Sequence, residues 1–270
     1  MADPTNYNPS WLHGMVGGPP GISFGGWSLL PSHARKSYGI DPVSNTVVTY
    51  SGDVYSIEHH LFANHIGNFP VDWGGPSYQV AYVTTPHGLY GFASTYGSKG
   101  AGWLCRANVA AGTWDMLSKQ GPGGHNEYDF LVHDSKRDRA LYFKYKGADV
   151  WAFDFKAKTW AKDEPAGKAP PIVMGDGAYI PGMDAVMLMF ADEPKGPEKL
   201  FFYRCDERKW YTAPSAGDPF RGANSAKDYS PIYDPELGIV VRITQCGFAA
   251  HVNVHVMRLD SKSLKLTPVE

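Results

Sequence analysis

The chain has 270 residues, of which 43% are hydrophobic and 19% charged, and its net charge is −2. This is the composition of a globular protein, and no basic run is present, so the usual nucleic-acid-binding proteins are excluded as a class. No apolar run approaches the roughly 18 residues that cross a bilayer as a helix, so we expect no membrane span.

Residues 1–30 form an expected N-terminal extension, and residues 31–270 an expected single domain. The N-terminus has neither the basic region nor the apolar core of a secretory signal. The compartment is therefore open: secreted or periplasmic if a signal has been removed, and cytoplasmic otherwise. Within and just beyond the extension, residues 23–32 (SFGGWSLLPS) have the pattern of an outer strand around Trp27.

A repeat of about 48 residues follows. Its tight turns recur at spacings of 44 to 52 residues, and their first members are Asp41, Thr85, Asp134, Gly182 and Asp234. Asp, Asn, Gly and Pro suit these turns because they tolerate or preset the required backbone angles.

Two expected strands follow each turn, and their apolar and polar residues alternate as in half-buried strands. The first strands are 46–50, 89–93, 140–145, 185–190 and 238–243, and the second are 53–58, 103–108, 149–155, 200–206 and 253–260. Each second strand is expected to end on a polar residue: Glu58, Asn108, Asp154, Asp206 and Asp260. A large apolar residue of an expected outer strand comes next: Phe62, Trp114, Trp160, Trp210 and Leu264.

Four strands in 40 to 50 residues are typical of one blade of a β-propeller. We therefore predict an all-β, five-bladed β-propeller with strands a (inner), b, c and d (outer) in each blade, and residues 126–134 as strand a of the third. Six blades with an incomplete N-terminal one is the alternative. Residues 23–32 would either pair with the last blade and close the ring or be the remnant of that sixth blade.

The alternating strands, Asp turns and terminal Trp resemble kelch-like propellers and the propeller domain of galactose oxidase. The resemblance covers about residues 30–268, and most blades lack the diglycine of a standard kelch repeat. A copper centre of the galactose-oxidase kind would need a Tyr–Cys cross-link, which no pattern in this sequence indicates. The three cysteines, Cys105, Cys205 and Cys246, are far apart and are expected to be free thiols, mostly buried.

In such a propeller the d-to-a and b-to-c connections lie on one face, around the central channel, where loops on a rigid scaffold bind ligands. Polar and aromatic residues gather in these connections, whereas the a-to-b turns contain ordinary turn residues. The repeated Trp114, Trp160 and Trp210 are expected to pack between blades, and His59, His60 and His133 to be structural or exposed. Trp73, which has no repeat position, would suit stacking on a sugar ring.

A lyase of acidic polysaccharides removes the proton beside a uronate carboxylate, with a base, an acid and a neutralising cation. His125 with Tyr78 or Tyr229 would transfer the protons, and Arg35 with His33 would neutralise the carboxylate. Some propellers resembling this one are lyases of this kind. We expect a carbohydrate-binding propeller and candidate lyase for uronate-containing oligosaccharides or polysaccharides. Its predicted substrate-binding residues are His33, Trp73, Gln79, Asn126, Glu127, Asp176, Lys227, Asp228 and His251.

The sequence also leaves three alternatives to the predicted carbohydrate-binding propeller. The first is a non-catalytic platform that binds a protein or a glycan. The second is a glycoside hydrolase, which needs paired carboxylates, with Glu127, Asp176 and Asp228 as candidates. The third places a metal ion at the channel mouth, assembled by the fold from His33, His65, His125 and His251, although no pair of them has a local ligand spacing. The predicted function requires no cofactor.

Overall fold

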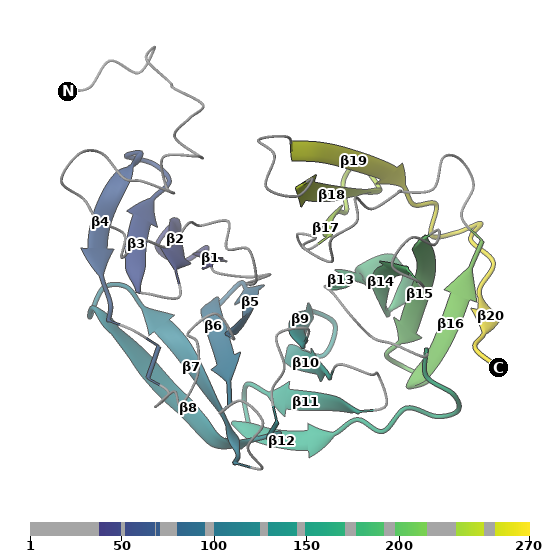
Figure 1. Cartoon of the computed structure of the whole chain (residues 1–270), viewed down its shortest axis with the longest axis horizontal. Coiled ribbons are helices and arrows are strands. Elements are labelled where there is room, and N and C mark those ends of the chain that lie inside the picture. The colour runs from purple at the N-terminus through teal and green to yellow at the C-terminus, as the bar shows by residue number, and fades with distance from the viewer. Residues whose placement is uncertain are drawn as a thin grey trace.

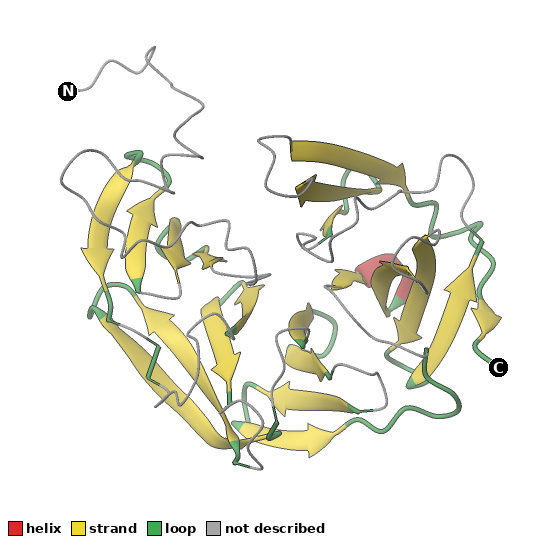
Figure 2. Ribbon diagram, viewed as in Figure 1, coloured by secondary structure: helices red, strands yellow, loops and turns green. Residues whose placement is uncertain are grey.

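The computed structural model describes residues 38–49, 52–67, 69–70, 80–94, 100–124, 129–144, 149–170, 177–191, 198–214, 231–245 and 252–270. Five small antiparallel sheets stand around a common centre as the blades of a propeller (Figure 1). Strands dominate the ribbon in Figure 2, and the one helix among the described residues is the 3-10 turn η1 (Pro181–Met183). The prediction of an all-β, five-bladed propeller is confirmed.

Each blade follows the chain. The first contains β1 (Tyr38–Asp41), β2 (Thr46–Thr49), β3 (Asp53–Ser56) and β4 (Leu61–His65). The second contains β5 (Ala81–Thr85), β6 (Gly88–Ala93), β7 (Gly102–Asn108) and β8 (Thr113–Gly121). The third contains β9 (Phe130–Asp134), β10 (Arg139–Phe143), β11 (Val150–Asp154) and β12 (Thr159–Lys162).

The last two blades depart from this plan. The fourth contains β13 (Gly177–Ile180), β14 (Ala185–Ala191), β15 (Glu198–Arg204) and β16 (Lys209–Ala213), and β20 (Thr267–Pro268) pairs with β16 as a fifth strand. The fifth contains β17 (Ile232–Asp234), β18 (Ile239–Gln245) and β19 (Val252–Arg258). The prediction that the segment around Leu264 is the outer strand of the fifth blade is wrong, because the chain crosses to the fourth blade after β19.

The tight turns explain why Asp recurs in the repeat. In the turn after β11, the Asp154 carboxylate accepts hydrogen bonds from the backbone N–H groups of Lys156 and Ala157, both at 2.8 Å. Asp234 does the same for Glu236 and Leu237, at 2.9 and 3.0 Å. The side chain thus replaces a backbone acceptor at the turn. The predicted strand ends at Glu58, Asp206 and Asp260 were two residues too late, since these residues belong to turns or follow the strand.

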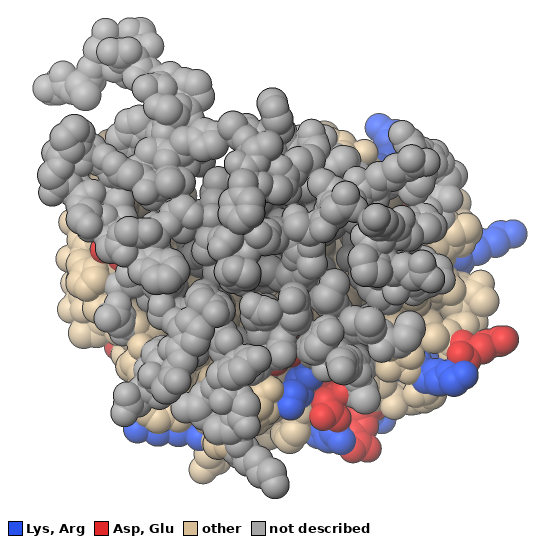
Figure 3. Space-filling model, viewed as in Figure 1, with Lys and Arg blue, Asp and Glu red and all other residues tan. Residues whose placement is uncertain are grey.

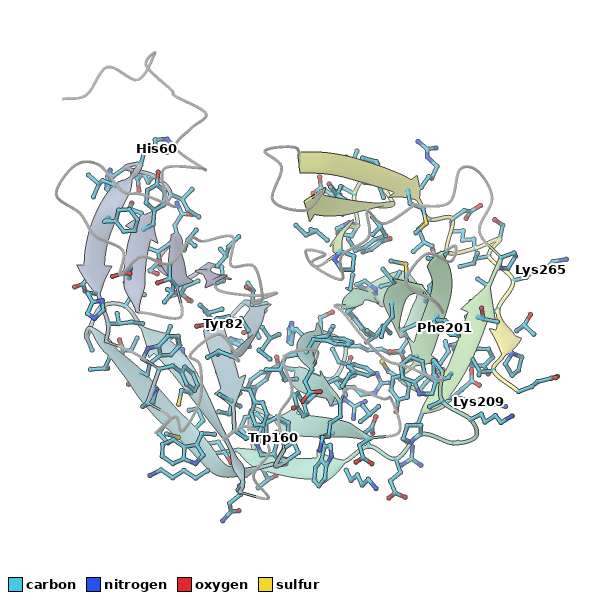
Figure 4. All side chains as sticks on the ribbon, viewed as in Figure 1. His60, Tyr82, Trp160, Phe201, Lys209 and Lys265 are labelled. Atoms are coloured by element: carbon cyan, nitrogen blue, oxygen red, sulfur yellow. The ribbon has the colours of Figure 1, made fainter. Side chains whose placement is uncertain are left out.

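The hydrophobic core lies between neighbouring blades. Trp160 packs on Phe92 of the second blade and Phe153 of its own, with ring centroids 5.1 and 5.2 Å away. Trp210 is fully buried and packs in the same way on Phe143 of the third blade. Figure 4 shows Trp160 between sheets, whereas Lys265 lies at the outer rim. The prediction that the repeated Trp residues pack between blades is confirmed.

A buried ionic network joins the third and fourth blades. The Arg137 guanidinium donates two hydrogen bonds of 2.8 Å to Asp184 of the fourth blade and one of 3.0 Å to Asp134. Arg139 donates to Asp134 and to Asp163, at 2.9 and 3.3 Å. The hydrogen bonds from Arg137 hold the pKa of Asp184 well below its usual range.

Two further expectations concern the cysteines and a membrane-spanning helix. Cys105 and Cys205 are free and buried, as predicted, and burial raises the pKa of the Cys105 thiol to about 12. Cys246 lies outside the described residues. The described part of the chain contains no helix with the length and apolarity needed to cross a bilayer.

Candidate functional site

The two faces of the ring differ in the length of their connections. The turns that join strands a to b and c to d are short, for example residues 42–45, 109–112, 135–138, 155–158 and 205–208. The d-to-a connections on the other face span residues 66–80, 122–129, 163–176 and 214–231. Each of these is at least twice as long as a four-residue turn. Long connections on a rigid scaffold are the usual location of binding residues.

The residues predicted to act on a substrate all belong, by their place in the chain, to the N-terminal segment or to a d-to-a or b-to-c connection. They lie outside the described residues: His33, Arg35, Trp73, Tyr78, Gln79, His125, Asn126, Glu127, Asp176, Lys227, Asp228, Tyr229 and His251. Their roles therefore stay predictions. The described residues next to them show how the scaffold is built on either side of these segments.

Asp129 and Tyr142 form a buried pair directly beside the stretch that contains His125 and Glu127. Asp129 immediately precedes inner strand β9, and its carboxylate accepts a hydrogen bond from the Tyr142 hydroxyl on β10. Burial, together with the nearby Asp129 charge, raises the pKa of Tyr142 well above its ordinary value. Tyr142 therefore stays protonated and acts as a donor, so the pair fixes the point at which residues 125–128 join the blade.

A lysine ties two loops of this blade together. The Lys144 ammonium donates a hydrogen bond of 2.9 Å to the carbonyl of Gly123, and the Lys144 backbone N–H donates one of 3.2 Å to the Asp149 carbonyl. Lys144 begins the b-to-c connection, and Gly123 lies in the d-to-a connection. Both kinds of connection thus lie on the same face of the third blade, as predicted.

Neither Asp129 nor Lys144 was among the predicted site residues. The signal for Asp129 was available in the sequence, because an acid at the start of the apolar inner strand 130–134 has to be paired once it is buried. The signal for Lys144 was weak, since a lysine after a strand is usually solvated.

Charges of opposite sign alternate on the outer side of the third blade. Lys162 lies 2.8 Å from Glu164 and 3.3 Å from Asp149. Figure 3 shows blue and red side chains next to one another at the lower edge of the molecule. These pairs are exposed, and exposed pairs add little to stability or to a ligand site.

The four-histidine metal site is not supported by its described member. His65 is the last residue of β4, the outer strand of the first blade, and its ring nitrogen lies 3.0 Å from Asp53. It therefore sits at the rim and not beside the inner strands. No group of three or more His, Cys, Asp or Glu side chains among the described residues is arranged to hold a metal ion.

Histidines also lie on the short-turn face. Asp138 bridges two of them, His133 at 3.1 Å and His87 of the second blade at 3.4 Å. His133 packs beside the Phe155 ring, with centroids 6.1 Å apart. The structural roles predicted for His133 and for the exposed turn residues His59 and His60 agree with their positions.

No protein-family model and no curated protein matches this chain. Solved structures do resemble it. TolB from Acinetobacter baumannii has 12% identity and a TM-score of 0.52, with 87% of this chain and 54% of that chain covered. A fungal alcohol oxidase of the AA5 family, in complex with copper, has 13% identity and a TM-score of 0.51, with 86% and 53% covered.

Putative TolB from Agrobacterium tumefaciens has 13% identity and a TM-score of 0.46, with 85% and 79% covered. The chain spans about half the length of the first two structures. At these identities the likeness is one of fold. It confirms the predicted propeller resemblance at that level: this chain is a five-bladed propeller similar in fold to TolB from Acinetobacter baumannii and to a fungal alcohol oxidase of the AA5 family.

Proposed function

We propose that this protein is a ligand-binding propeller and that it binds on the face with the long connections. The observation that supports this most strongly is the difference between the faces. One face consists of short turns held by Asp carboxylates, and the other of connections such as 66–80 and 214–231. A propeller fold supports a binding role, and its loops decide what is bound.

We further propose that the ligand is an acidic oligosaccharide. The support comes from the residue types in the connections and in the N-terminal segment: Arg35 and Lys227 for a carboxylate, and Trp73 for the face of a sugar ring. Asp129 and Tyr142 would hold the neighbouring residues 125–128 in place during binding.

Titration calorimetry with an oligogalacturonate tests this proposal, with a neutral oligosaccharide of equal length as the comparison. We expect the acidic ligand to bind more tightly, and Arg35→Ala and Trp73→Ala each to weaken binding by roughly tenfold. Lys156→Ala, on the short-turn face, is the matched control and should bind normally. Equal binding of both ligands would overturn the preference for an acidic oligosaccharide, and binding of neither would remove the oligosaccharide proposal and leave the protein-binding platform. Normal binding by both variants would remove the roles proposed for Arg35 and Trp73.

Cleavage by β-elimination is a separate step of the proposal. His125 would take the proton next to the carboxylate, and Tyr78 or Tyr229 would donate one to the departing glycosidic oxygen, which leaves an unsaturated uronate. The ultraviolet absorbance of that product is the readout. We expect it with the wild type and not with His125→Ala, while ligand binding by the variant persists. Binding without product would identify a non-catalytic platform.

A further inference from the structure

Exposed large hydrophobic residues gather on the first and fifth blades, which are the two ends of the ring in Figure 1. They are Ile40, Val43 and Leu61 on the first blade and Ile232, Leu237 and Val256 on the fifth. The described residues of the other three blades contribute none to this set.

Two of these residues occupy positions that are core in other blades. Ile232 pairs with Val241 as Val132 pairs with Leu141, yet Ile232 is 59% exposed and Val132 only 5%. Val256, two residues before the end of strand c, is 59% exposed, whereas its counterpart Ala152 is 8% exposed. In the third blade this side of the sheet packs on the fourth blade. Among the described residues, the same side of the fifth blade has no such cover.

Within the described residues, the fifth blade also has one strand fewer than the others. Its sheet has the order β17-β18-β19, whereas the other four sheets each have a fourth strand beside strand c. The downstream chain does not supply it, since Thr267 and Pro268 pair with β16. β19 therefore has a free edge among the described residues, and free edges invite strand pairing.

The other blades define what the missing strand should contain. In each of them the residue before the last one of strand c lies opposite the large aromatic of strand d, as in the pairs Tyr55–Phe62, Ala107–Trp114, Phe153–Trp160 and Tyr203–Trp210. The equivalent residue of β19 is Met257, which pairs with Val240 as Phe153 does with Ala140. Met257 is only partly buried, whereas Phe153 and Tyr203 are fully buried.

We propose that residues 23–32 provide this strand within the same chain, antiparallel to β19, with Trp27 opposite Met257. Trp27 and Leu29 would then cover the core between the fourth and fifth blades, where Met257 and Leu264 are only partly buried. In this register Ser28 would lie opposite Val256 and Leu30 opposite Val254.

Chain order and length favour this occupant over a second copy of the protein. Strand d directly precedes strand a of the following blade everywhere else in the ring, and residues 23–32 directly precede β1. Residues 33–37 would make the connection from this strand to β1. A tethered strand also pairs at a far higher effective concentration than a separate chain.

A cross-link tests the register. Ser28→Cys with Val256→Cys, in a Cys246→Ser background, should form a disulfide within one chain on mild oxidation, because Cβ atoms of directly opposite residues are about 4.5–5.5 Å apart. Ser28→Cys with Arg258→Cys is the off-register control, with a diagonal separation of about 7–8 Å. Non-reducing electrophoresis and peptide mapping give the readout. A disulfide between two chains, or equal rates for both pairs, would overturn the proposal.

The stability of Trp27 variants provides a second test. Trp27→Ala should lower the Tm clearly, Trp27→Phe should lower it less, and Trp11→Ala, outside the proposed strand, should leave it unchanged. The proposal fails if Trp27→Ala and Trp11→Ala give the same Tm.

Discussion

The junction of the third and fourth blades and the two ends of the ring are built from the same repeat, yet they differ in burial. At the junction, Trp210, Phe143 and Asp134 are shielded from solvent. At the ends, Ile232 and Val256 occupy core positions of the repeat and are exposed. The two broad faces of a blade's sheet are therefore not buried by the blade itself. Register and alternation are set by the blade itself, and burial is set by its neighbour.

The largest effect is expected from Trp210→Ala at the junction. The indole is fully buried against Tyr203 and Phe143, so its removal leaves a cavity and should lower the free energy of unfolding by about 3–5 kcal/mol. Urea denaturation measures this loss, with Trp210→Phe as the milder control. A loss as small as that of an exposed residue would contradict the packing described here.

Asp134→Ala should come next. Its carboxylate is fully buried and accepts hydrogen bonds from Arg137 and Arg139, so its removal leaves two partly buried guanidinium groups short of an acceptor and should cost about 3 kcal/mol. Asp138→Asn in the same turn is the matched control: Asn tolerates the left-handed backbone at this position (φ 48), and the exposed carboxylate that it replaces should contribute about 0.5 kcal/mol or less. Equal effects of the two variants would show that the network adds nothing.

The junction should also respond to acid. Because the pKa of Asp184 is lowered in the folded protein, its ionised form stabilises the fold above the unfolded pKa of about 4, and that contribution is lost as the pH falls further. Arg137→Ala removes the main cause of the lowered pKa and should flatten this part of the stability curve. Unfolding measured between neutral and acidic pH tests it, and parallel curves for the two proteins would refute the role of Arg137.

Tyr142→Phe should have a smaller effect on stability and a specific one on binding. It removes the hydroxyl that donates to Asp129, which should cost about 1–2 kcal/mol. If the pair positions residues 125–128, ligand affinity should fall as well. Tyr211→Phe, whose hydroxyl donates to Glu207 at the outer rim, is the control and should leave affinity unchanged.

The smallest effect is expected at the ends of the ring. Leu237 is exposed in the turn between β17 and β18, so Leu237→Ser should change the free energy of unfolding by less than about 0.5 kcal/mol. Thermal unfolding beside the wild type tests this. A larger loss would mean that something covers this turn.

Features that recur in every blade could be predicted from the sequence. The turns at Asp41, Asp134 and Asp234 and the packing of Trp114, Trp160 and Trp210 follow from local chemistry and from a fixed period, so they could be located without coordinates. The pairing of Thr267 with Thr212 could not, because it occurs once and depends on where the chain turns after β19.

The partners in the pairs Arg137–Asp184 and Tyr142–Asp129 could not be identified from the sequence for a related reason, although Asp129 could be expected to need a partner. A charge in a turn is usually solvated, and only its distance from another strand or blade shows that it is paired. For the candidate site, the sequence predicted a face and a set of residue types, and the hydrogen bond from Lys144 to Gly123 supports the shared face of the two kinds of connection in the third blade.

The strand β20 has a practical consequence. It lies on the outside of β16, so the chain leaves the molecule at the rim of the ring and away from both faces (Figure 1). An affinity tag or fluorophore attached after Glu270 would therefore stand beside the fourth blade. Anchoring the protein to a sensor through that tag would leave the loop face open to glycans and proteins alike, which suits the search for its ligand.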